Sequence, residues 1–210
     1  LELAPGLTLA RHNLAVVLYR QTRAAEALSE VEALLAGDPA NPGYRNLQAA
    51  ALGQLGEYAR AIGVYETLLR DYPLQPKGWM SYGHALKTVG RQADAVAAYR
   101  KAISQAPSLG EAWWSLANLK TVKFSPADLE AMRAEAVRPD ISDEDRFHLQ
   151  FALGKALEDA GDYAGSFEQY RLGNALRKQS LDYDADETSS HLARSRALFT
   201  RGFFAERQGY

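Results

Sequence analysis

Small, apolar and aromatic residues recur along this chain of 210 residues with a period of 34 positions. Pro5, Pro39, Pro73 and Pro107 mark the period, and a short apolar stretch, an alanine and an aromatic residue precede each of the last three prolines. The chain lacks alternating strand-like runs bounded by turns. A fixed period of this length is typical of a solenoid, in which each unit buries its apolar face only against its neighbours. The pattern therefore predicts an all-α solenoid of antiparallel helix pairs.

The units match one another most closely in the middle of the chain. One full unit carries Trp79, Gly83, Gly90, Ala95, Tyr99, Ala102 and Pro107, and the unit before it carries Ala49, Leu52, Gly56, Ala61, Tyr65 and Pro73. Ala117 follows Gly83 by one period, but the next equivalent, Gly154, comes three residues late, which places an insertion within 121–142. We therefore expect units at 8–41, 42–75 and 76–109, a divergent unit at 110–141 and an extended unit at 142–182.

Each recurring residue type has a physical reason for its place. Glycine or alanine at positions 49, 83, 117 and 154 allows two helices to approach closely, and we expect these positions to face Ala61 or Ala95. Aromatic side chains fill the wider gaps between helix pairs. Gly56, Gly90 and Gly161 are expected to take the left-handed conformation that ends a helix. The prolines stop each second helix because they cannot continue it.

Taken in order, these positions resemble the tetratricopeptide repeat (TPR). The resemblance lies in a Trp, a Leu-Gly pair, a tight Gly turn, a small Ala, an aromatic residue, another Ala and a closing Pro, and it covers nearly the whole chain. It implies a right-handed TPR superhelix of about four to five units, whose concave face holds a protein or an extended peptide.

The two ends of the chain are expected to differ from the repeats. Residues 1–7 look like the end of a truncated preceding repeat. Residues 183–210 are expected to hold a C-terminal capping helix, from about Asp186 to Phe199 with Asp184 or Asp186 as its N-cap, and a linker to a missing C-terminal domain.

The insertion within 121–142 carries its own helix start signal. Ser125 can cap a helix, and Pro126 suits the first helical position. Because Phe124 occupies the place of the turn glycine, we expect a longer loop before this helix and a local change in superhelix pitch.

A narrower resemblance concerns the residues near the C-terminus. They look like the junction in bacterial proteins where TPR units lead into a sulfotransferase domain, and they are Arg196, Leu198, Phe199, Thr200, Phe203 and Phe204. The resemblance implies a parent protein that uses the sulfuryl donor PAPS, with the catalytic domain outside this chain. The alternatives are a free-standing TPR interaction scaffold and a TPR module of another transferase.

Composition and charge restrict the possible functions. The formal net charge of −2 gives no electrostatic case for binding nucleic acid or a membrane surface, and the absence of cysteine excludes disulfides and thiolate chemistry. His12, His84, His148 and His191 are too far apart in sequence for a local metal motif, and phosphate-loop, zinc-protease and serine-elbow motifs are missing. We therefore expect a cytoplasmic, non-catalytic chain without a cofactor or a metal.

Helical spacing identifies the residues that could hold a peptide. On each first helix, positions spaced i, i+3, i+7 and i+10 share a face that does not contact the partner helix. The candidate groove residues on this face are His12, Tyr19, Asn46, Lys77, Met80, His84, Lys87, Trp114, Asn118, His148, Phe151 and Lys155.

Trp113 and Trp114 test this assignment of faces because neighbouring residues point about 100° apart on a helix. Trp113 occupies the repeat's packing position, so Trp114 is expected to face the groove with Met80 and Phe151. The other interpretation is a solvated face with incidental aromatic residues. A chaperone-binding role is disfavoured because His12 and Val16 stand where the related adaptors carry Lys and Asn.

Overall fold

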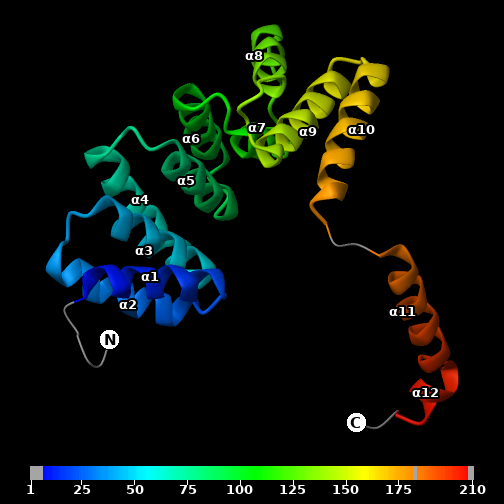
Figure 1. Ribbon diagram of the computed structural model, residues 1–210, viewed down its shortest axis with the longest axis horizontal. Coiled ribbons are helices and arrows are strands. Elements are labelled where there is room, and N and C mark those ends of the chain that lie inside the picture. The colour runs from blue at the N-terminus through cyan, green and yellow to red at the C-terminus, as the bar shows by residue number, and fades with distance from the viewer. Residues whose placement is uncertain (1–6, 182–183, 208–210) are drawn as a thin grey trace. The chain divides into compact units, whose positions relative to one another are not determined.

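The computed structural model describes residues 7–181 and 184–207, and every regular element among them is a helix (Figure 1). The chain forms two units that divide at Gly173. The prediction of an all-α chain is therefore confirmed. The expected remnant of a preceding repeat falls almost entirely on residues 1–6, which lie outside the described residues.

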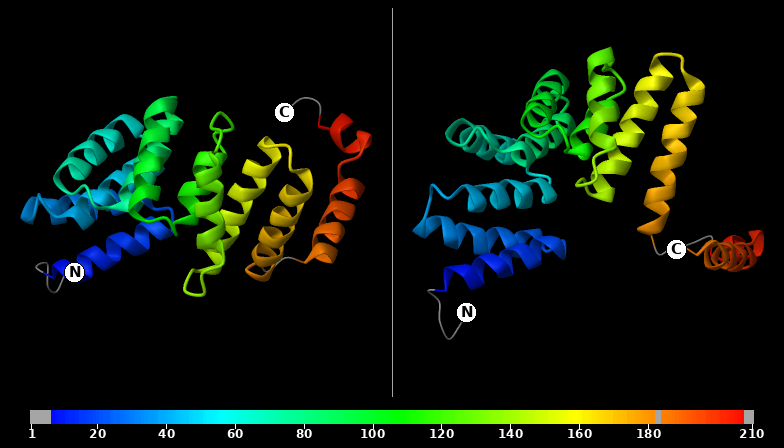
Figure 2. Two further views of the ribbon diagram at one scale, coloured as in Figure 1. Left: turned by 90° about the horizontal axis from the view of Figure 1, so that it is seen from above. Right: turned by 45° about the horizontal axis from the view of Figure 1, so that its top comes forward.

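The first unit contains ten helices among the described residues, the last of which continues into the second unit. They are α1 (Thr8–Arg20), α2 (Ala24–Gly37), α3 (Pro42–Gln54), α4 (Tyr58–Asp71), α5 (Pro76–Thr88), α6 (Gln92–Gln105), α7 (Gly110–Ala117), α8 (Pro126–Ala136), α9 (Asp143–Asp159) and α10 (Tyr163–Gln179). Helices α1 to α6 form three pairs, and the second helix of each pair also packs against the first helix of the next (Figure 1). Both views of Figure 2 show α10 beside α9.

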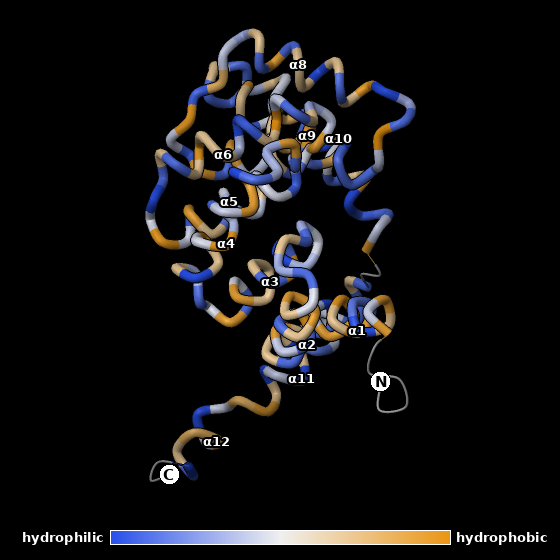
Figure 3. Tube along the Cα trace, turned by 90° about the vertical axis from the view of Figure 1, so that its left-hand side faces the viewer, coloured by the Kyte–Doolittle hydropathy of each residue, from blue (hydrophilic) through white to orange (hydrophobic). Residues whose placement is uncertain are grey.

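The hydropathy pattern agrees with this stacking. Hydrophobic and hydrophilic residues are intermixed along the helices of the first unit (Figure 3). The largest cluster of buried side chains runs from Ile62 on α4 to Ala156 on α9, and three smaller clusters lie among α1 to α4. Each repeat thus depends on its neighbours for burial.

Three turn glycines have the backbone that the sequence predicts. Gly56, Gly90 and Gly161 have φ values of 79°, 81° and 83°. This left-handed conformation costs a glycine little because it has no Cβ. The equivalent residue in the first pair is Thr22, which adopts a φ of 60° despite its branched side chain.

The small residues of the first helices lie under aromatic rings of the second helices. A Cβ added to Gly83 would lie 2.6 Å from the Tyr99 ring, and one added to Gly154 would lie 2.8 Å from the Tyr170 ring. The expectation that Gly83 faces Ala95 is therefore incomplete, because the atoms nearest to it belong to Tyr99. The missing side chain lets the ring lie directly against the helix backbone.

The closing prolines accept a hydrogen bond that recurs with the repeat. In three successive repeats the side-chain N–H at one position donates to the proline carbonyl six residues earlier. These bonds are Arg45 to Pro39 at 2.9 Å, Trp79 to Pro73 at 2.8 Å and Trp113 to Pro107 at 2.8 Å. The tryptophan position is thus defined by a polar contact as well as by packing.

The divergent unit has a different helix arrangement. Helix α7 has only 8 residues, and residues 118–125 form a longer connection to α8, as Phe124 predicted. Among the described helices, α7 and α8 each pack closely against α9 rather than against each other. Leu129 stands where α6 has Ala95, and the larger side chain does not allow the same close approach. The expected change in superhelix pitch stays a prediction.

Side-chain contacts hold the long connection in place. The Phe124 ring lies 6.1 Å from the Trp113 ring, and the Arg100 guanidinium lies 5.5 Å from the centre of the Phe124 ring. Ser125 and Asp128 form the capping box at the start of α8. The connection is therefore packed against the repeats.

The second unit contains the end of α10 and the helices α11 (Ala185–Leu198) and α12 (Arg201–Ala205). Asp184 caps α11 by accepting hydrogen bonds from two backbone N–H groups, which confirms one of the two expected N-caps. The rings of Phe199, Phe203 and Phe204 contact one another. A helix is thus present where a capping helix was expected, and its capping role stays a prediction.

Two glycine substitutions should have opposite effects on stability. Gly83→Ala should lower the free energy of unfolding by about 1–3 kcal/mol, because the new methyl group would overlap the Tyr99 ring. Gly63→Ala should raise it by about 0.5–1 kcal/mol, because no atom lies within 4 Å of the new methyl group. Urea unfolding of both variants measures the difference. Equal effects at the two sites would contradict the close helix approach.

An ion pair at the end of α9 should make stability depend on pH. The side chains of Lys123 and Lys155 lie 2.8 and 2.7 Å from Asp159 and lower the pKa of its carboxyl group. The ionised carboxylate therefore stabilises the fold above the ordinary aspartate pKa of about 3.9, and this contribution is lost as the pH falls through the folded-state pKa. Asp159→Asn should lower the melting temperature at pH 7 by about 2–4 °C and have a diminishing effect toward pH 2.

Thermal unfolding followed by circular dichroism at pH 7, 5, 3 and 2 measures this effect. Glu130→Gln is the matched control, because Glu130 lies near the same end of α9 but forms none of the ion pairs found in the described part of the chain. A melting difference for Asp159→Asn that stays constant down to pH 2 would show that the ion pair contributes nothing.

Candidate functional site

Two hollows in the first unit bring together parts of the predicted groove. The first, here called the Tyr58 hollow, includes Tyr19 and His84. The second, here called the Trp114 hollow, includes Trp114, Asn118 and Lys155. The predicted residues are thus divided between two places along the array.

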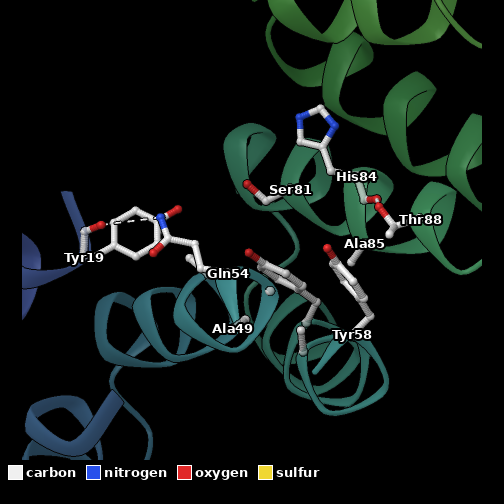
Figure 4. A pocket seen from close by; sticks show the side chains of 12 residues that line it. Tyr19, Ala49, Gln54, Tyr58, Ser81, His84, Ala85 and Thr88 are labelled. Carbon is white, nitrogen blue, oxygen red and sulfur yellow. Dashed lines mark hydrogen bonds between the residues drawn. The ribbon is translucent and has the colours of Figure 1, made fainter. Parts of the chain in front are cut away.

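The Tyr58 hollow has a volume of about 310 Å³ and lies among α1, α3, α4 and α5 (Figure 4). Small residues make part of its wall, and hydroxyl, amide and imidazole groups make the rest. The lining residues are Tyr19, Ala49, Ala50, Gly53, Gln54, Tyr58, Ala61, Tyr65, Ser81, His84, Ala85 and Thr88. The side-chain amide of Gln54 donates to the backbone carbonyl of Tyr19 at 3.4 Å, which joins α3 to α1.

Among the described residues, no Asp, Glu, Lys or Arg side chain lines the Tyr58 hollow. Burial raises the pKa of Tyr65 to about 12, although its hydrogen bond with Ser81 acts in the opposite direction. The Tyr65 hydroxyl is therefore neutral at physiological pH. The hollow offers hydrogen-bonding groups above small residues, which suits an uncharged side chain.

A polar cluster lies beside this hollow. The His84 Nδ1 atom is 2.9 Å from the Tyr99 hydroxyl oxygen, and its Nε2 atom is 3.7 Å from a carboxylate oxygen of Glu111. His84, and then the charges of His148 and Lys77, lower the pKa of Glu111 despite its partial burial. Three predicted groove residues thus act electrostatically on a single carboxylate, and His84 is the one whose side chain is paired with it.

The Trp114 hollow has a volume of about 450 Å³ and lies among α7, α9 and α10. Its lining residues are Trp114, Ala117, Asn118, Lys120, Lys155, Glu158 and Tyr170. The Trp114 ring lies 5.6 Å from the Phe151 ring, which lies 6.4 Å from the Tyr170 ring. These three rings form a continuous aromatic wall.

The polar groups of the Trp114 hollow are partly engaged. The Tyr170 hydroxyl donates to Glu158 at 3.3 Å, and burial together with this carboxylate raises the pKa of Tyr170 to about 12. Lys155 is bound to Asp159. Lys120 is exposed and forms none of the ion pairs found in the described residues, so it is free to meet a ligand.

Burial limits what two of the predicted groove residues can offer a ligand. Met80 is only 7% exposed and belongs to the core cluster with Ile62 and Trp113, so the expectation that it takes a peptide side chain is wrong. Helix α5 packs against both α4 and α6, which leaves it a narrower free face than the end helices have. The Oδ1 atom of Asn46 is buried, so this acceptor cannot hold a peptide backbone.

The two adjacent tryptophans differ as expected. Trp113 is 2% exposed and its indole N–H bonds to Pro107, whereas Trp114 is only partly buried and lines an open hollow. The remaining candidates lie apart from the hollows. His12 contacts the Tyr44 ring with ring centres 5.5 Å apart, and Lys87 is exposed in the last turn of α5.

Sequence reasoning missed the contribution of the second helices. Tyr58 and Tyr65 come from α4 and Tyr170 comes from α10, yet the second helices were considered only for packing. One signal could have identified Tyr58. Tyr58 follows the turn glycine Gly56 by two residues and is the first residue of α4. A side chain at this position lies at the end of the helix pair, where it is not fully covered by the partner helix.

The described residues contain no group of three or more His, Asp or Glu side chains placed to hold a metal ion. None of the described helices has the length and hydropathy that a membrane crossing requires.

Comparisons with known proteins support the same fold. The family model described as "Tetratricopeptide repeat" matches residues 46–109. No curated protein sequence matches the chain.

Solved structures extend the likeness beyond the middle repeats. A solved chain of MamA from Desulfovibrio magneticus RS-1, which runs from residue 41 to the end, is 20% identical with a TM-score of 0.57, and the alignment covers 84% of this chain and 97% of that chain. The thermophilic TPR protein TTC0263 from Thermus thermophilus is 18% identical with a TM-score of 0.59, covering 88% of this chain and 99% of that protein. The chain therefore has the fold of a tetratricopeptide-repeat solenoid, and residues 46–109 match the pattern of that family.

Proposed function

We propose that the face formed by the first helices binds an extended segment of a partner protein. The observation that carries this proposal is the position of Trp114, a large ring left partly open in a hollow while its neighbour Trp113 is buried. A partly desolvated aromatic side chain with polar groups around it is the usual composition of a binding hot spot. The Phe151 and Tyr170 rings extend the same wall.

The two hollows favour different parts of such a segment. The Tyr58 hollow suits an uncharged side chain because no charged side chain of the described residues lines it. The Trp114 hollow suits an apolar or aromatic side chain against the rings, with the amide of Asn118 beside it for the peptide backbone. His84, Lys77, His148 and Glu111 form the polar cluster beside the first hollow and complete the proposed recognition surface.

The narrower proposal concerns the parent protein. The junction residues Arg196, Phe199 and Phe204 favour a parent in which this array presents a partner to a cytoplasmic sulfotransferase domain. A free-standing interaction scaffold, or a module of another transferase, is the alternative. The array itself is proposed to be non-catalytic.

Trp114→Ala tests the proposed binding face. Random 12-residue peptides displayed on phage are first selected on the wild-type chain, and the affinity of the enriched peptides is then measured by fluorescence anisotropy. We expect Trp114→Ala to weaken their binding at least about tenfold, the cost of losing a hot-spot anchor. Because Trp114 also contacts Phe151, we expect the melting temperature to fall, but less than in Trp113→Ala, which opens a cavity in the core.

Phe167→Ala is the matched control, since this ring on α10 is 70% exposed and lines neither hollow. It should leave the peptide affinity unchanged. The proposal fails if the enriched peptides bind Trp114→Ala and the wild type equally well, or if Phe167→Ala weakens them as much.

Calorimetry with PAPS tests the non-catalytic role. The purified chain should show no saturable heat of binding, because its sequence has no phosphate loop. Micromolar binding would show that the array itself holds the sulfuryl donor and would overturn this part of the proposal.

A further inference from the structure

A third hollow lies between α5 and α6 and shares no lining residue with the two hollows of the proposed binding face. Its volume is about 330 Å³. Its lining residues are Trp79, Tyr82, Arg91, Asp94, Ala97, Ala98 and Lys101. We call it the Trp79 hollow.

The aromatic residues of this hollow have their polar atoms satisfied inside the protein. The indole N–H of Trp79 donates to the Pro73 carbonyl at 2.8 Å, and the Tyr82 hydroxyl donates to Glu66 at 3.1 Å. The two rings meet edge to face with centres 6.1 Å apart. Both side chains are partly exposed, so the hollow presents mainly ring carbon to solvent.

The next repeat shows one way in which its tryptophan is covered. Trp113 follows Trp79 by one period but is only 2% exposed, because the Phe124 ring lies 6.1 Å from it. Phe124 stands one period after Gly90, which has no side chain to contribute. The fully buried Met132 likewise stands one period after the small Ala98. The two units differ in helix arrangement, because α8 packs closely on α9 and not on α7, but Phe124 shows that a phenylalanine ring can cover the tryptophan of a repeat.

The charges at the edge of the Trp79 hollow favour a ligand that carries an acidic group next to an aromatic ring. Arg91 is paired with Asp94 at 2.7 Å and with Glu66 at 3.5 Å. Lys101 is exposed and forms none of the ion pairs found in the described residues, so the unpaired charge at this rim is positive. A carboxylate beside the incoming ring would therefore be attracted to Lys101.

We propose that the Trp79 hollow is a second protein-binding site, which receives an aromatic side chain next to an acidic residue of a partner segment in the way that Phe124 covers Trp113. The partner's ring would contact Trp79 and Tyr82 above Ala98, and its carboxylate would lie near Lys101. This site does not depend on the proposed role of the Trp114 hollow.

The test uses short peptides and the indole N–H signals of the nitrogen-15 labelled chain. The probe is acetyl-Asp-Phe-Glu-amide, compared with acetyl-Asp-Ala-Glu-amide and acetyl-Lys-Phe-Lys-amide. The Trp79 signal is assigned with Trp79→Phe. We expect the first peptide to shift this signal with a dissociation constant at least about fivefold lower than either comparison peptide, because it alone has both the ring and the carboxylates.

Two variants separate this site from general peptide adsorption. Ala98→Met should abolish the shift, because Ala98 lines the hollow and the longer side chain would fill it, and the folding of this variant is checked by its melting temperature. Lys101→Glu changes only an exposed side chain and should reverse the preference between the acidic and the basic peptide. Lys178→Glu, an exposed lysine on α10, is the matched control and should change neither.

Three outcomes would overturn the inference. They are equal shifts with the phenylalanine and alanine peptides, an unchanged preference in Lys101→Glu, and a shift of the Trp114 signal in place of that of Trp79. A shift of the Trp114 signal in place of the Trp79 signal would remove the second site and leave the proposed binding face intact. Conversely, if the Trp79 signal shifts as expected but Trp114→Ala does not weaken the phage-selected peptides, the second site stands and the proposed binding face fails.

Discussion

The fold depends on a contact, present in three of the helix pairs, between a small residue on the first helix and a tyrosine sixteen positions later on the second helix. Gly83 lies under the Tyr99 ring, Gly154 lies under the Tyr170 ring, and Ala49 packs in one cluster with Tyr65. Because the first helix presents backbone or a single methyl group there, the ring can lie against the helix and bury its whole face. Isolated helices of 13 or 14 residues are marginal in water, so this packing stabilises both members of a pair.

The Trp114 hollow arises where this contact is missing. Arg133 stands sixteen positions after Ala117 and is exposed, so no ring covers the small residue. Helix α8 packs on α9, and α9 packs closely on α7. Ala117 then becomes part of the wall of the Trp114 hollow, next to Asn118 and Lys155. Ala117 itself stays buried at 1% exposed, and the Trp114 and Tyr170 rings beside it provide the surface that a ligand can meet.

Much of the fold could be predicted because it follows from local chemistry. Turn glycines, helix caps at Ser125 and Asp184, and the period of 34 act within a few residues or within one repeat. The close pairing of α7 with α9 could not be predicted, because it depends on how the larger Leu129 packs in three dimensions.

Less of the candidate site could be predicted, because the exposure of its residues depends on packing between helices and not on local sequence. Helical geometry separates Trp113 from Trp114 without any knowledge of the neighbours. Whether Met80 is exposed depends on α4 and α6, which cover the middle repeat from both sides and bury it. Tyr58 and Tyr170 come to the hollows from second helices, whose periodicity indicates packing alone.

Trp79 and Trp113 show that the repeat does not itself decide whether its tryptophan is covered. Both indoles donate to a proline carbonyl at the same distance, so neither needs burial or an outside acceptor to satisfy its N–H. The difference lies in the segment that follows each first helix, which carries Gly90 in one repeat and, one period later, Phe124, whose ring lies against Trp113. The divergent unit, whose α8 packs on α9, brings the Phe124 ring over Trp113, whereas the regular turn at Gly90 leaves the Trp79 ring partly open.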